Sequence, residues 1–412
     1  MDSTLHPGAL AGVRVLDLSR VLAGPWSGQL LADLGADVVK VERPCAGDDT
    51  RAWGPPWLSD PDGHSTGESA YYLSANRNKR SVTIDLGQPE GQRLVRQLTS
   101  KADVLLENFK VGGLAQYGLD YASLKTLNPR LVYCSITGFG QTGPYASRAG
   151  YDFLIQGMGG LMSLTGRADG TEGDGPLKAG VALTDIMTGL YATVAVLAAL
   201  KRREQSGEGQ HIDLALLDVQ IACLANQAAN YLVSGVVPRR MGNAHPNIVP
   251  YQDFPTADGY MIIAVGNDSQ FASLCKTLGR PEWSGDERFA INPQRVKHRS
   301  ELIALIHGIT VRRTTDEWVA AMKAVGVPCG PINTLDRVFA DQHVKSRHTR
   351  IDMPHPLAKQ VPLVANPIRM SESPVQYRRA PPTLGQHTDE VLLDWLDATA
   401  AEIGDLRVRN AI

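Results

Sequence analysis

Residues 13–44, VRVLDLSRVLAGPWSGQLLADLGADVVKVERP, contain the pattern on which the rest of the chain builds. The runs VRVLDLS and DVVKVERP are rich in β-branched and aliphatic residues and predict two strands. Between them, SGQLLADLGA follows the LAGP turn and has the apolar spacing of a helix. A strand, a helix and a second strand in this order predict a βαβ unit, in which the two strands run parallel.

The same alternation continues to residue 140. Three more strand-like runs follow, namely SVTIDL at 81–86, ADVLLENF at 102–109 and LVYCSITGFG at 131–140. Helical spacers separate them, and the clearest spacer is GQRLVRQLTSK at 91–101. This alternation predicts an α/β fold with a parallel sheet that helices cover on both faces.

The composition changes after residue 210. QHIDLALLDVQIACLANQAANYL at 210–232 predicts one long helix or a strand and a helix, and the Pro-, Gly- and Asn-rich stretch at 233–250 predicts a linker. Residues 250–330 contain the strand-like GYMIIAVG and the amphipathic helices RSELIALIHGI and TDEWVAAMKAV, which suffice for a small second domain. PCGPIN at 328–333 marks its end, and DEVLLDWLDA predicts a last helix near the C-terminus.

The overall composition excludes several classes of protein. Lys and Arg total 41 against 43 Asp and Glu, with no long run of one sign, so the sequence lacks the basic footprint of a nucleic-acid-binding protein. The N-terminus has no basic region followed by an apolar one, and nowhere do about 18 uncharged apolar residues run together. We therefore expect a cytoplasmic protein without a membrane partner. The five cysteines are far apart and form no Cys-x-x-Cys pair, which predicts reduced thiols and no metal site.

GFGQTG at 138–143 matches the G-x-G-x-x-G pattern of dinucleotide-binding proteins and follows a predicted strand. In that motif the last glycine opens a helix whose amides bind pyrophosphate, whereas here Pro144 and the polar YASRAGY follow. No acidic residue ends a clear second strand about 20 residues further on to bind a ribose. The pattern favours a plain glycine turn, and a nicotinamide oxidoreductase stays as an alternative.

Asp185 is a single carboxylate within the apolar stretch VALTDIMTGLYATVAVLAAL at 181–200. Apolar residues from Ile186 to Leu200 follow helical spacing, so Asp185 lies at the start of a helix. The simplest interpretation is that Thr184 and Asp185 cap this helix. The same position suits a carboxylate nucleophile, because amides at a helix start favour the anion while apolar surroundings remove water from it.

Segments spread over nearly the whole chain resemble the class III coenzyme A transferases, the family of formyl-CoA and carnitine CoA-transferases. They include 10–44, NRNKRSVTIDL at 76–86, ADVLLENF, the pair NPRLVYCSITGFGQTGPY and GYDFLIQGMGGLMSLTG within 128–166, and GEGQHIDLALLD at 207–218. VGVPCGPINTLDRVFAD and LGQHTDEVL fit the same pattern in the same order. The resemblance is specific for the family and only weakly specific for the substrate.

The resemblance implies a Rossmann-like large domain with a parallel sheet, a smaller inserted α/β domain, and two subunits threaded through one another as an interlocked homodimer. On this basis we expect the N-terminal part of the large CoA-binding domain at 1–225, the small domain with its linkers at 226–333, and a C-terminal part at 334–412 that returns to the large domain. The family's catalytic aspartate corresponds to Asp185, which outweighs the capping interpretation.

The resemblance also implies contacts with coenzyme A, transferred motif by motif. They are Val21, Leu22 and Ala23 at the thioester end, Arg43 at phosphate, Ile84, Asp85 and Leu86 at the adenine, Asn108 and Phe109 beside the pantetheine, and Tyr151 and Asp152 near the thioester. Arg43 has the firmest physical basis, because a guanidinium pairs well with phosphate. A substrate loop is expected at Gly242, Asn243 and His245 in GNAHPN.

Two departures from the family pattern bear on the reaction. Members that racemise α-methylacyl-CoA have a His before the Asp of the GYD segment, and this chain has Tyr151 there, which disfavours a racemase. The formyl-CoA branch has a run of glycines in a mobile loop over the site, whereas Gly242 is the only glycine in the corresponding GNAHPN. This difference argues against formate and oxalate as substrates.

The expected activity is CoA transfer through an aspartyl-CoA thioester on Asp185, with acyl-CoA thioesters as substrates and no tightly bound cofactor. We expect succinyl-CoA as donor and a small dicarboxylate such as glutarate or itaconate as acceptor. Arg239, Arg240 and His245 are candidates to bind its distal carboxylate. The alternatives are a racemase of the same fold, a nicotinamide oxidoreductase and a CoA-binding protein without turnover.

Overall fold

The protein forms two compact units in the computed structural model, which describes residues 8–412. Unit 1 contains the residues up to Leu161 together with Ala179–Ala229 and Lys345–Ile412, and unit 2 contains Met162–Lys178 and Asn230–Val344. The limit after Ala229 lies a few residues beyond the one expected after residue 225. The limit after Val344 lies eleven residues beyond the one expected after residue 333. The segment 162–178, which the sequence placed in the first domain, belongs to the second compact unit.

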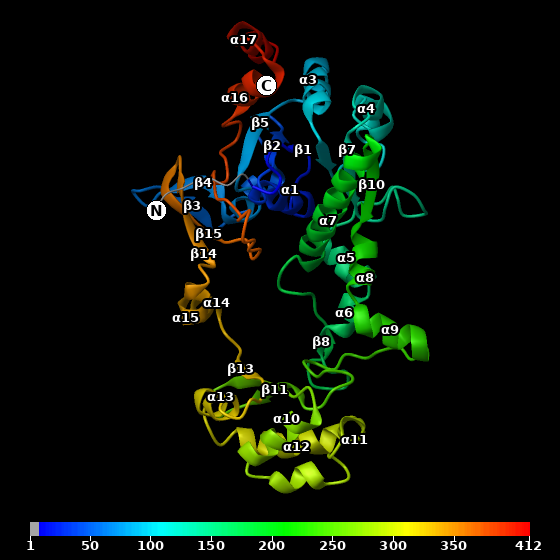
Figure 1. The fold of residues 1–412 in the computed structure, drawn as a ribbon, viewed down its shortest axis with the longest axis vertical. Coiled ribbons are helices and arrows are strands. Elements are labelled where there is room, and N and C mark those ends of the chain that lie inside the picture. Colours follow the sequence, from blue (N-terminus) through cyan, green and yellow to red (C-terminus); the bar gives the residue numbers. More distant parts are fainter. Residues whose placement is uncertain (1–7) are drawn as a thin grey trace. The chain divides into compact units, whose positions relative to one another are not determined.

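Unit 1 is built on a six-stranded sheet in which all neighbouring strands run parallel (Figure 1). The order across the sheet is β10 (Gln210–Ala215), β7 (Val132–Thr137), β6 (Val104–Glu107), β1 (Arg14–Asp17), β2 (Asp37–Glu42) and β5 (Lys79–Thr83). The parallel α/β architecture predicted from the alternating sequence is confirmed.

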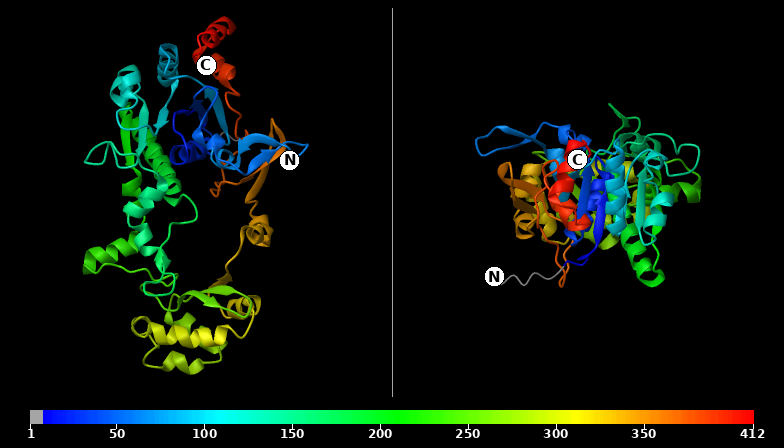
Figure 2. Two further views of the ribbon diagram at one scale, coloured as in Figure 1. Left: turned by 180° about the vertical axis from the view of Figure 1, so that it is seen from behind. Right: turned by 90° about the horizontal axis from the view of Figure 1, so that it is seen from above.

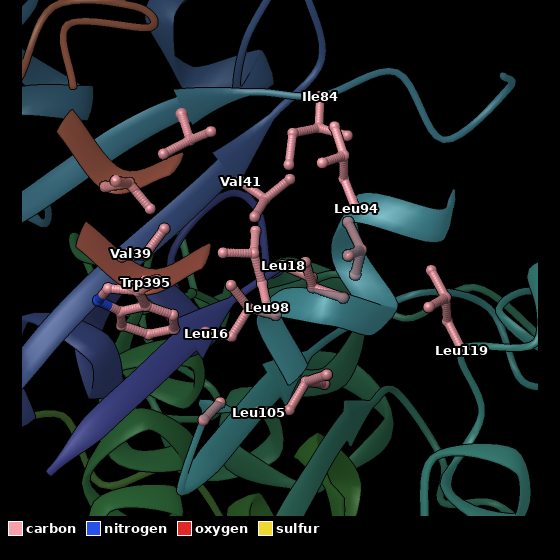
Figure 3. Packing of buried hydrophobic residues seen from close by; sticks show 14 of the residues in the cluster. Leu16, Leu18, Val39, Val41, Ile84, Leu94, Leu98, Leu105, Leu119 and Trp395 are labelled. Atoms are coloured by element: carbon pink, nitrogen blue, oxygen red, sulfur yellow. The ribbon is translucent and has the colours of Figure 1, made fainter. Parts of the chain in front are cut away.

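The two faces of this sheet carry separate hydrophobic cores, because successive side chains of a strand point to opposite faces. On one face Leu16 packs with residues of α3 (Pro89–Lys101), α4 (Tyr121–Leu127), α16 (Thr388–Leu396) and α17 (Ala400–Val408). Figure 3 shows Leu16, Val39, Leu98 and Trp395 converging there. On the other face Val15 packs with residues of α1 (Ala23–Asp33) and α7 (Leu183–Ser206).

The C-terminal segment contributes to unit 1 although it is the last part of the chain. α16 contacts both β5 and α3, and the views in Figures 1 and 2 show these elements side by side. The Trp395 indole N–H donates to Asp37 Oδ2 at 2.9 Å, which joins the tail to β2. The other elements of unit 1 are η1 (Asp49–Ala52), β3 (Trp57–Ser59), β4 (Ser65–Ser69), α2 (Ala70–Ser74), η2 (Ala115–Tyr117), α5 (Asp152–Met158), α8 (Leu216–Ala222), β14 (Arg350–His355) and β15 (Ala358–Val364).

Unit 2 has its own core around Phe254, Phe271 and Trp318. Its three-stranded antiparallel sheet has the order β11 (Tyr251–Pro255), β12 (Tyr260–Ala264) and β13 (Cys329–Pro331). PCGPIN, interpreted above as the end of the domain, therefore supplies the third strand of this sheet. The remaining elements are β8 (Gly166–Arg167), β9 (Gly175–Pro176), α10 (Asp268–Thr277), η3 (Pro281–Gly285), α11 (Asn292–Lys297), α12 (Arg299–Thr310), α13 (Thr315–Lys323) and α14 (Leu335–Ala340).

Three segments lie at or across the limits between the units. Residues 210–232 form β10, α8 and most of α9 (Ala225–Ser234), so the strand-and-helix interpretation of this stretch is correct and the single-helix one is wrong. α6 (Leu161–Leu164) and α15 (Gln342–Ser346) are short helices at the other limits.

Candidate active site

Asp185 lies in the first turn of α7, with Ala182 as the residue that precedes the helix. Neither Thr184 nor Asp185 caps this helix with its side chain, so the capping interpretation is wrong. The cap comes from α5 instead, because Asp152 Oδ1 accepts the amides of Thr184 at 2.8 Å and of Asp185 at 3.3 Å. The Thr184 hydroxyl donates to Gln220 Oε1 at 2.6 Å. Among residues 8–412, the Asp185 carboxylate itself has no hydrogen-bond or ion-pair partner.

The surroundings of Asp185 make its carboxyl group a weak acid. The residue is 9% exposed, and its burial together with the nearby negative charge of Asp152 raises its pKa to about 7. The sequence predicted that amides at the helix start would favour the anion, but those amides bind Asp152. Asp185 is consequently a desolvated carboxylate that is half ionised near neutral pH, and a more basic carboxylate is a better nucleophile once ionised.

In its first half, α7 presents its small residues to the core and several larger apolar ones to the outside. Thr188, Gly189 and Ala192 are buried, whereas Leu190 and Val194, which are among the apolar residues with helical spacing, are 39% and 65% exposed. A Cβ added to Gly189 would lie 2.7 Å from the Ala23 carbonyl oxygen, so only glycine permits this approach. Gly189 is one turn beyond Asp185, and the approach therefore brings the start of α7 beside the start of α1.

In the described part of the chain, α7 is the one helix long and apolar enough to cross a membrane on length and composition alone. Its inner face packs against α1 and β7, which accounts for its small and apolar residues within unit 1.

Asp185 opens into a cavity of about 190 Å³, here called cavity A, at the carboxyl edge of the parallel sheet. Its walls come from the turn after β1, the residues after β6, the end of β7 and the loop that follows it. Six of the predicted coenzyme A contacts line it with Asp185, namely Val21, Leu22, Ala23, Asn108, Phe109 and Tyr151. In parallel α/β sheets this edge is where ligands bind. Asp152 does not line cavity A, and it acts on Asp185 through its charge.

A second cavity, cavity B, has a volume of about 320 Å³ and is lined by the other predicted contacts, Arg43, Ile84, Asp85 and Leu86. Arg43 follows β2 and Ile84 follows β5, so cavity B lies at the same edge of the sheet. The two cavities share Arg20, Asp49 and Phe109 as lining residues. The two cavities are therefore adjacent, and together they make up a tract along the sheet edge between Asp185 and Leu86.

Several residues of this site escaped the sequence analysis. Arg20, Lys110 and Arg148 place three cations on the wall of cavity A, and the Arg20 guanidinium is paired with Asp49 at 3.3 Å. Tyr71 is coupled to the site, because its burial and the charges of Asp185, Asp152 and Asp48 raise its pKa to about 12. None of these residues follows a recognisable motif, and only the fold brings them to the sheet edge.

The predicted substrate loop lies in unit 2. Gly242 has φ of 61°, and the amide of His245 donates to the Tyr251 carbonyl oxygen at 3.0 Å. The His245 Nδ1 atom accepts the Asn247 amide at 3.1 Å, which is the ordinary bonding of a loop histidine. Asn243 belongs to the same loop.

Arg240, a candidate for the distal carboxylate, is already ion-paired with Asp169. Its backbone amide also donates to Asp169 Oδ2 at 3.2 Å, so the residue joins its loop to the segment 162–178.

The glycines of GFGQTG form a turn. Gly140 and Gly143 have positive φ angles of 87° and 91°, and the next helix, α5, begins only at Asp152. The helix that a dinucleotide-binding motif needs at its last glycine is therefore missing from this described loop.

One group of possible metal ligands occurs among residues 8–412, at Asp60, Asp62 and His64 on the β3–β4 hairpin. The Asp60 Oδ1 atom accepts the amides of Asp62 at 2.9 Å and of His64 at 2.8 Å. These bonds are those of a hairpin turn, in which the carboxylate serves the backbone.

Comparison with known proteins identifies the family. Residues 10–388 match the family model described as CoA-transferase family III. The chain is 54% identical over 393 residues to a succinate–glutarate CoA-transferase of Agrobacterium fabrum (95% of this chain, 97% of that protein). It is 43% identical over 397 residues to a succinyl-CoA:glutarate CoA-transferase of Homo sapiens (96% and 88%). The crystal structure of a CAIB/BAIF family protein from Brucella suis matches with a TM-score of 0.83 and 52% identity, covering 94% of this chain and 100% of that one.

The chain therefore belongs to CoA-transferase family III. It is an enzyme that transfers coenzyme A, as its resemblance to this family implied.

Proposed function

We propose that this enzyme transfers coenzyme A from succinyl-CoA to a small dicarboxylate, with glutarate as the first candidate and itaconate as the second. The observation that carries the proposal is the buried, unpartnered Asp185 carboxyl at the end of cavity A, with a pKa of about 7. The relatives named above, which are glutarate CoA-transferases with succinyl-CoA or succinate as the other substrate, support the choice of acids.

The reaction begins when the Asp185 carboxylate attacks the thioester carbonyl of succinyl-CoA. The C–S bond breaks, which leaves a mixed anhydride on Asp185 and a free CoA thiolate. The thiolate attacks the aspartyl carbonyl, releases succinate and leaves an aspartyl-CoA thioester. The acceptor carboxylate attacks this thioester and the same steps run in reverse, so the new acyl-CoA departs and Asp185 is regenerated without any net proton or redox change.

The tract of cavities A and B supports one orientation of coenzyme A. We assign the adenine to Ile84, Asp85 and Leu86, a phosphate to Arg43, and the pantetheine to the sheet edge beside Asn108 and Phe109. A thioester that follows this path ends beside Val21, Leu22, Ala23 and Tyr151, where Asp185 is.

Each tetrahedral intermediate carries an oxyanion that needs hydrogen-bond donors. We assign this role to the amides of Leu22 and Ala23 at the start of α1. No acceptor for either amide is found among residues 8–412. Gly242, Asn243 and His245 remain our proposed substrate loop.

The distal carboxylate of a dicarboxylate substrate requires a cation near the thioester. Arg148 lines cavity A, and its guanidinium lies over the rings of Phe139 at 5.1 Å and Tyr145 at 4.6 Å. Aromatic faces hold a guanidinium flat and leave its N–H groups directed outward for a carboxylate. Arg148 and Lys110 have no acidic partner among the described residues, in contrast to Arg240. We therefore favour Arg148 over Arg239, Arg240 and His245 for this contact.

We also propose that the enzyme acts as an interlocked homodimer in the cytoplasm, with a Rossmann-like large domain, an inserted small domain and no tightly bound cofactor. Large apolar side chains are exposed along α5, α7 and α9, among them Phe153, Val194, Leu232 and Val233. Exposed large apolar side chains are typical of association surfaces. A second copy of the chain is the partner that the family resemblance implies.

Trapping of the intermediate tests this function. With succinyl-CoA and no acceptor, the peptide containing ALTDIMTG gains the mass of coenzyme A, and hydroxylamine converts Asp185 to a hydroxamate. The Asp185→Ala variant shows neither product and forms no glutaryl-CoA. Glutarate and itaconate then restore turnover in the wild type, whereas monocarboxylates of equal length do so poorly. An unmodified peptide together with exchange of an α-proton in deuterated water would replace the transferase by a racemase.

A further inference from the structure

The backbone between β1 and α1 is strained where it enters cavity A. Val21 has φ of 70°, in the left-handed region, which is unfavourable for a β-branched residue because its side chain crowds the following carbonyl. A conformation of this kind persists only where the surrounding structure enforces it. Val21 lies directly before Leu22 and Ala23, whose amides we assign to the oxyanion.

A buried ion pair holds this turn. The Val21 amide donates to both carboxylate oxygens of Asp48 at 3.2 Å. Asp48 Oδ2 lies 2.9 Å from Lys40 Nζ, and both side chains are fully buried. Lys40 Nζ also donates to the Ser19 carbonyl oxygen at 2.8 Å. One ion pair thus restrains the turn at two points, an amide and a carbonyl two residues apart.

Other side chains occupy the remaining polar groups of the turn. The Ser19 amide donates to Asp17 Oδ1 at 3.0 Å. The Arg20 amide donates to Asn108 Oδ1 at 2.9 Å, and Asn108 Nδ2 returns a bond to the Arg20 carbonyl oxygen at 2.7 Å. The amides of residues 19–21 are therefore all engaged by side chains. The next amides along the chain, those of Leu22 and Ala23, are the first ones free to bind a substrate oxygen.

Glycine at position 24 completes this arrangement. A Cβ at Gly24 would lie 2.2 Å from the Ser19 Oγ atom, so a side chain there would displace the turn. The hydroxyl of Ser19 is itself bonded to Asp17.

We propose that the Lys40–Asp48 ion pair is a positioning device for catalysis, which keeps Val21 left-handed and thereby directs the Leu22 and Ala23 amides at the reacting carbonyl. This inference rests on the proposed function, because it presupposes the oxyanion formed at Asp185. Asp48 borders cavity B but is only 1% exposed, and its oxygens are occupied by Val21, Lys40 and Thr50. It acts through the turn and does not touch the substrate.

The test compares Asp48→Asn with a matched control at the other end of α1. The control is Asp33→Asn, which breaks the buried ion pair between Asp33 and Arg77, whose atoms lie 2.6 Å apart. Since loss of one oxyanion donor costs about 10²–10³ in kcat, we expect a loosened turn to lower kcat about 10–100-fold in Asp48→Asn. KM for succinyl-CoA stays within about threefold, because ground-state contacts are kept. Asp33→Asn loses stability but retains kcat per folded molecule.

A second substitution separates positioning from general structural support. Glycine adopts φ of 70° without strain. With glycine at position 21, the backbone therefore has no strain to relieve by leaving its place when the ion pair is broken. The double variant Asp48→Asn/Val21→Gly should regain about tenfold in kcat over Asp48→Asn, the equivalent of the strain removed. A loss of folding or a changed charge at Asp48 would not be repaired by this backbone change. Val21→Gly alone keeps the ion pair and measures the direct effect on kcat of removing the Val21 side chain from cavity A, so it is the reference for the double variant.

The outcomes distinguish this inference from the proposed function. If the wild type forms no Asp185 adduct with succinyl-CoA, the proposed function fails. If the wild type forms it, two results would each overturn the positioning role. One is an equal kcat loss in Asp48→Asn and Asp33→Asn, and the other is a double variant no faster than Asp48→Asn. A kcat loss confined to Asp48→Asn and relieved by Val21→Gly supports it, as does an unchanged pH midpoint for the adduct-forming step.

Discussion

The raised pKa of Asp185 predicts that this proposed catalytic residue destabilises the enzyme in a pH-dependent way. In the unfolded chain this carboxyl ionises around its ordinary value of 3.8, whereas in the folded protein it keeps its proton up to about 7. Between these values unfolding releases a proton, so rising pH favours the unfolded state. The stability that protonated Asp185 contributes is complete below 3.8 and is lost as the pH rises through about 7.

Asp185→Asn removes this effect while preserving the shape of the side chain. At 1.36 kcal/mol for each pKa unit, a displacement from 3.8 to about 7 corresponds to about 4 kcal/mol. The asparagine variant should therefore match the wild type in free energy of unfolding at pH 4. Its advantage should grow to as much as about 4 kcal/mol above pH 7. The variant should also be inactive in CoA transfer, because an amide does not attack the thioester.

Urea unfolding at a series of pH values between 4 and 8.5, followed by tryptophan fluorescence, measures this difference. Asp258→Asn provides a control of opposite sign, because hydrogen bonds from Thr315 lower the pKa of Asp258. The contribution of Asp258 to stability is present at neutral pH and is lost as the pH falls. A difference between wild type and Asp185→Asn that stays constant over the whole range would refute the reasoning about Asp185.

Three further predictions concern the same site. Asp152→Asn removes a negative charge near Asp185, so the pH midpoint of hydroxamate formation with succinyl-CoA should fall below that of the wild type. An unchanged midpoint would leave burial as the only cause of the raised pKa of Asp185. Arg43→Gln should raise KM for succinyl-CoA about tenfold or more with little change in kcat, because a charge-assisted hydrogen bond contributes about 1.5–3 kcal/mol. Steady-state kinetics measure both constants, and a loss of kcat at constant KM would contradict the assignment of Arg43 to a phosphate. Gly189→Ala should cost about 1–3 kcal/mol of stability by pushing α7 away from Ala23. If the variant unfolds at the same temperature as the wild type, α7 and α1 move apart without cost and the prediction is wrong.

The sequence predicted much of unit 1 because its signals are local. β-branched runs and helical spacing are properties of a few neighbouring residues, and the strands after 13, 37, 102 and 131 appear in the structure close to their predicted positions. The third strand of unit 2 was missed, because a short run with glycine and two prolines has the composition of a turn. Cys329–Pro331 becomes a strand through its pairing with β12.

The orientation of α7 shows the limit of periodicity. The helical spacing of large apolar residues runs through Leu190 and Val194, yet these side chains are exposed and the buried face carries Thr188, Gly189 and Ala192. The close approach of α1 selects small residues, and this partner is more than 150 residues earlier in the chain. Spacing identifies the helix but does not identify the face that another helix covers.

By itself the sequence determined the alternation of strands and helices, hence the parallel α/β sheet, and through its motifs the family and the candidate aspartate. Only the tertiary structure decided the chemistry of that aspartate. Asp152 takes the helix-start amides and adds a negative charge near Asp185, and burial removes water from the carboxyl. The cations of cavity A and the Lys40–Asp48 pair reach the same sheet edge from separate strands and loops. Desolvation and charge depend on distances in space between residues remote in the chain, and no local pattern of residue types contains those distances.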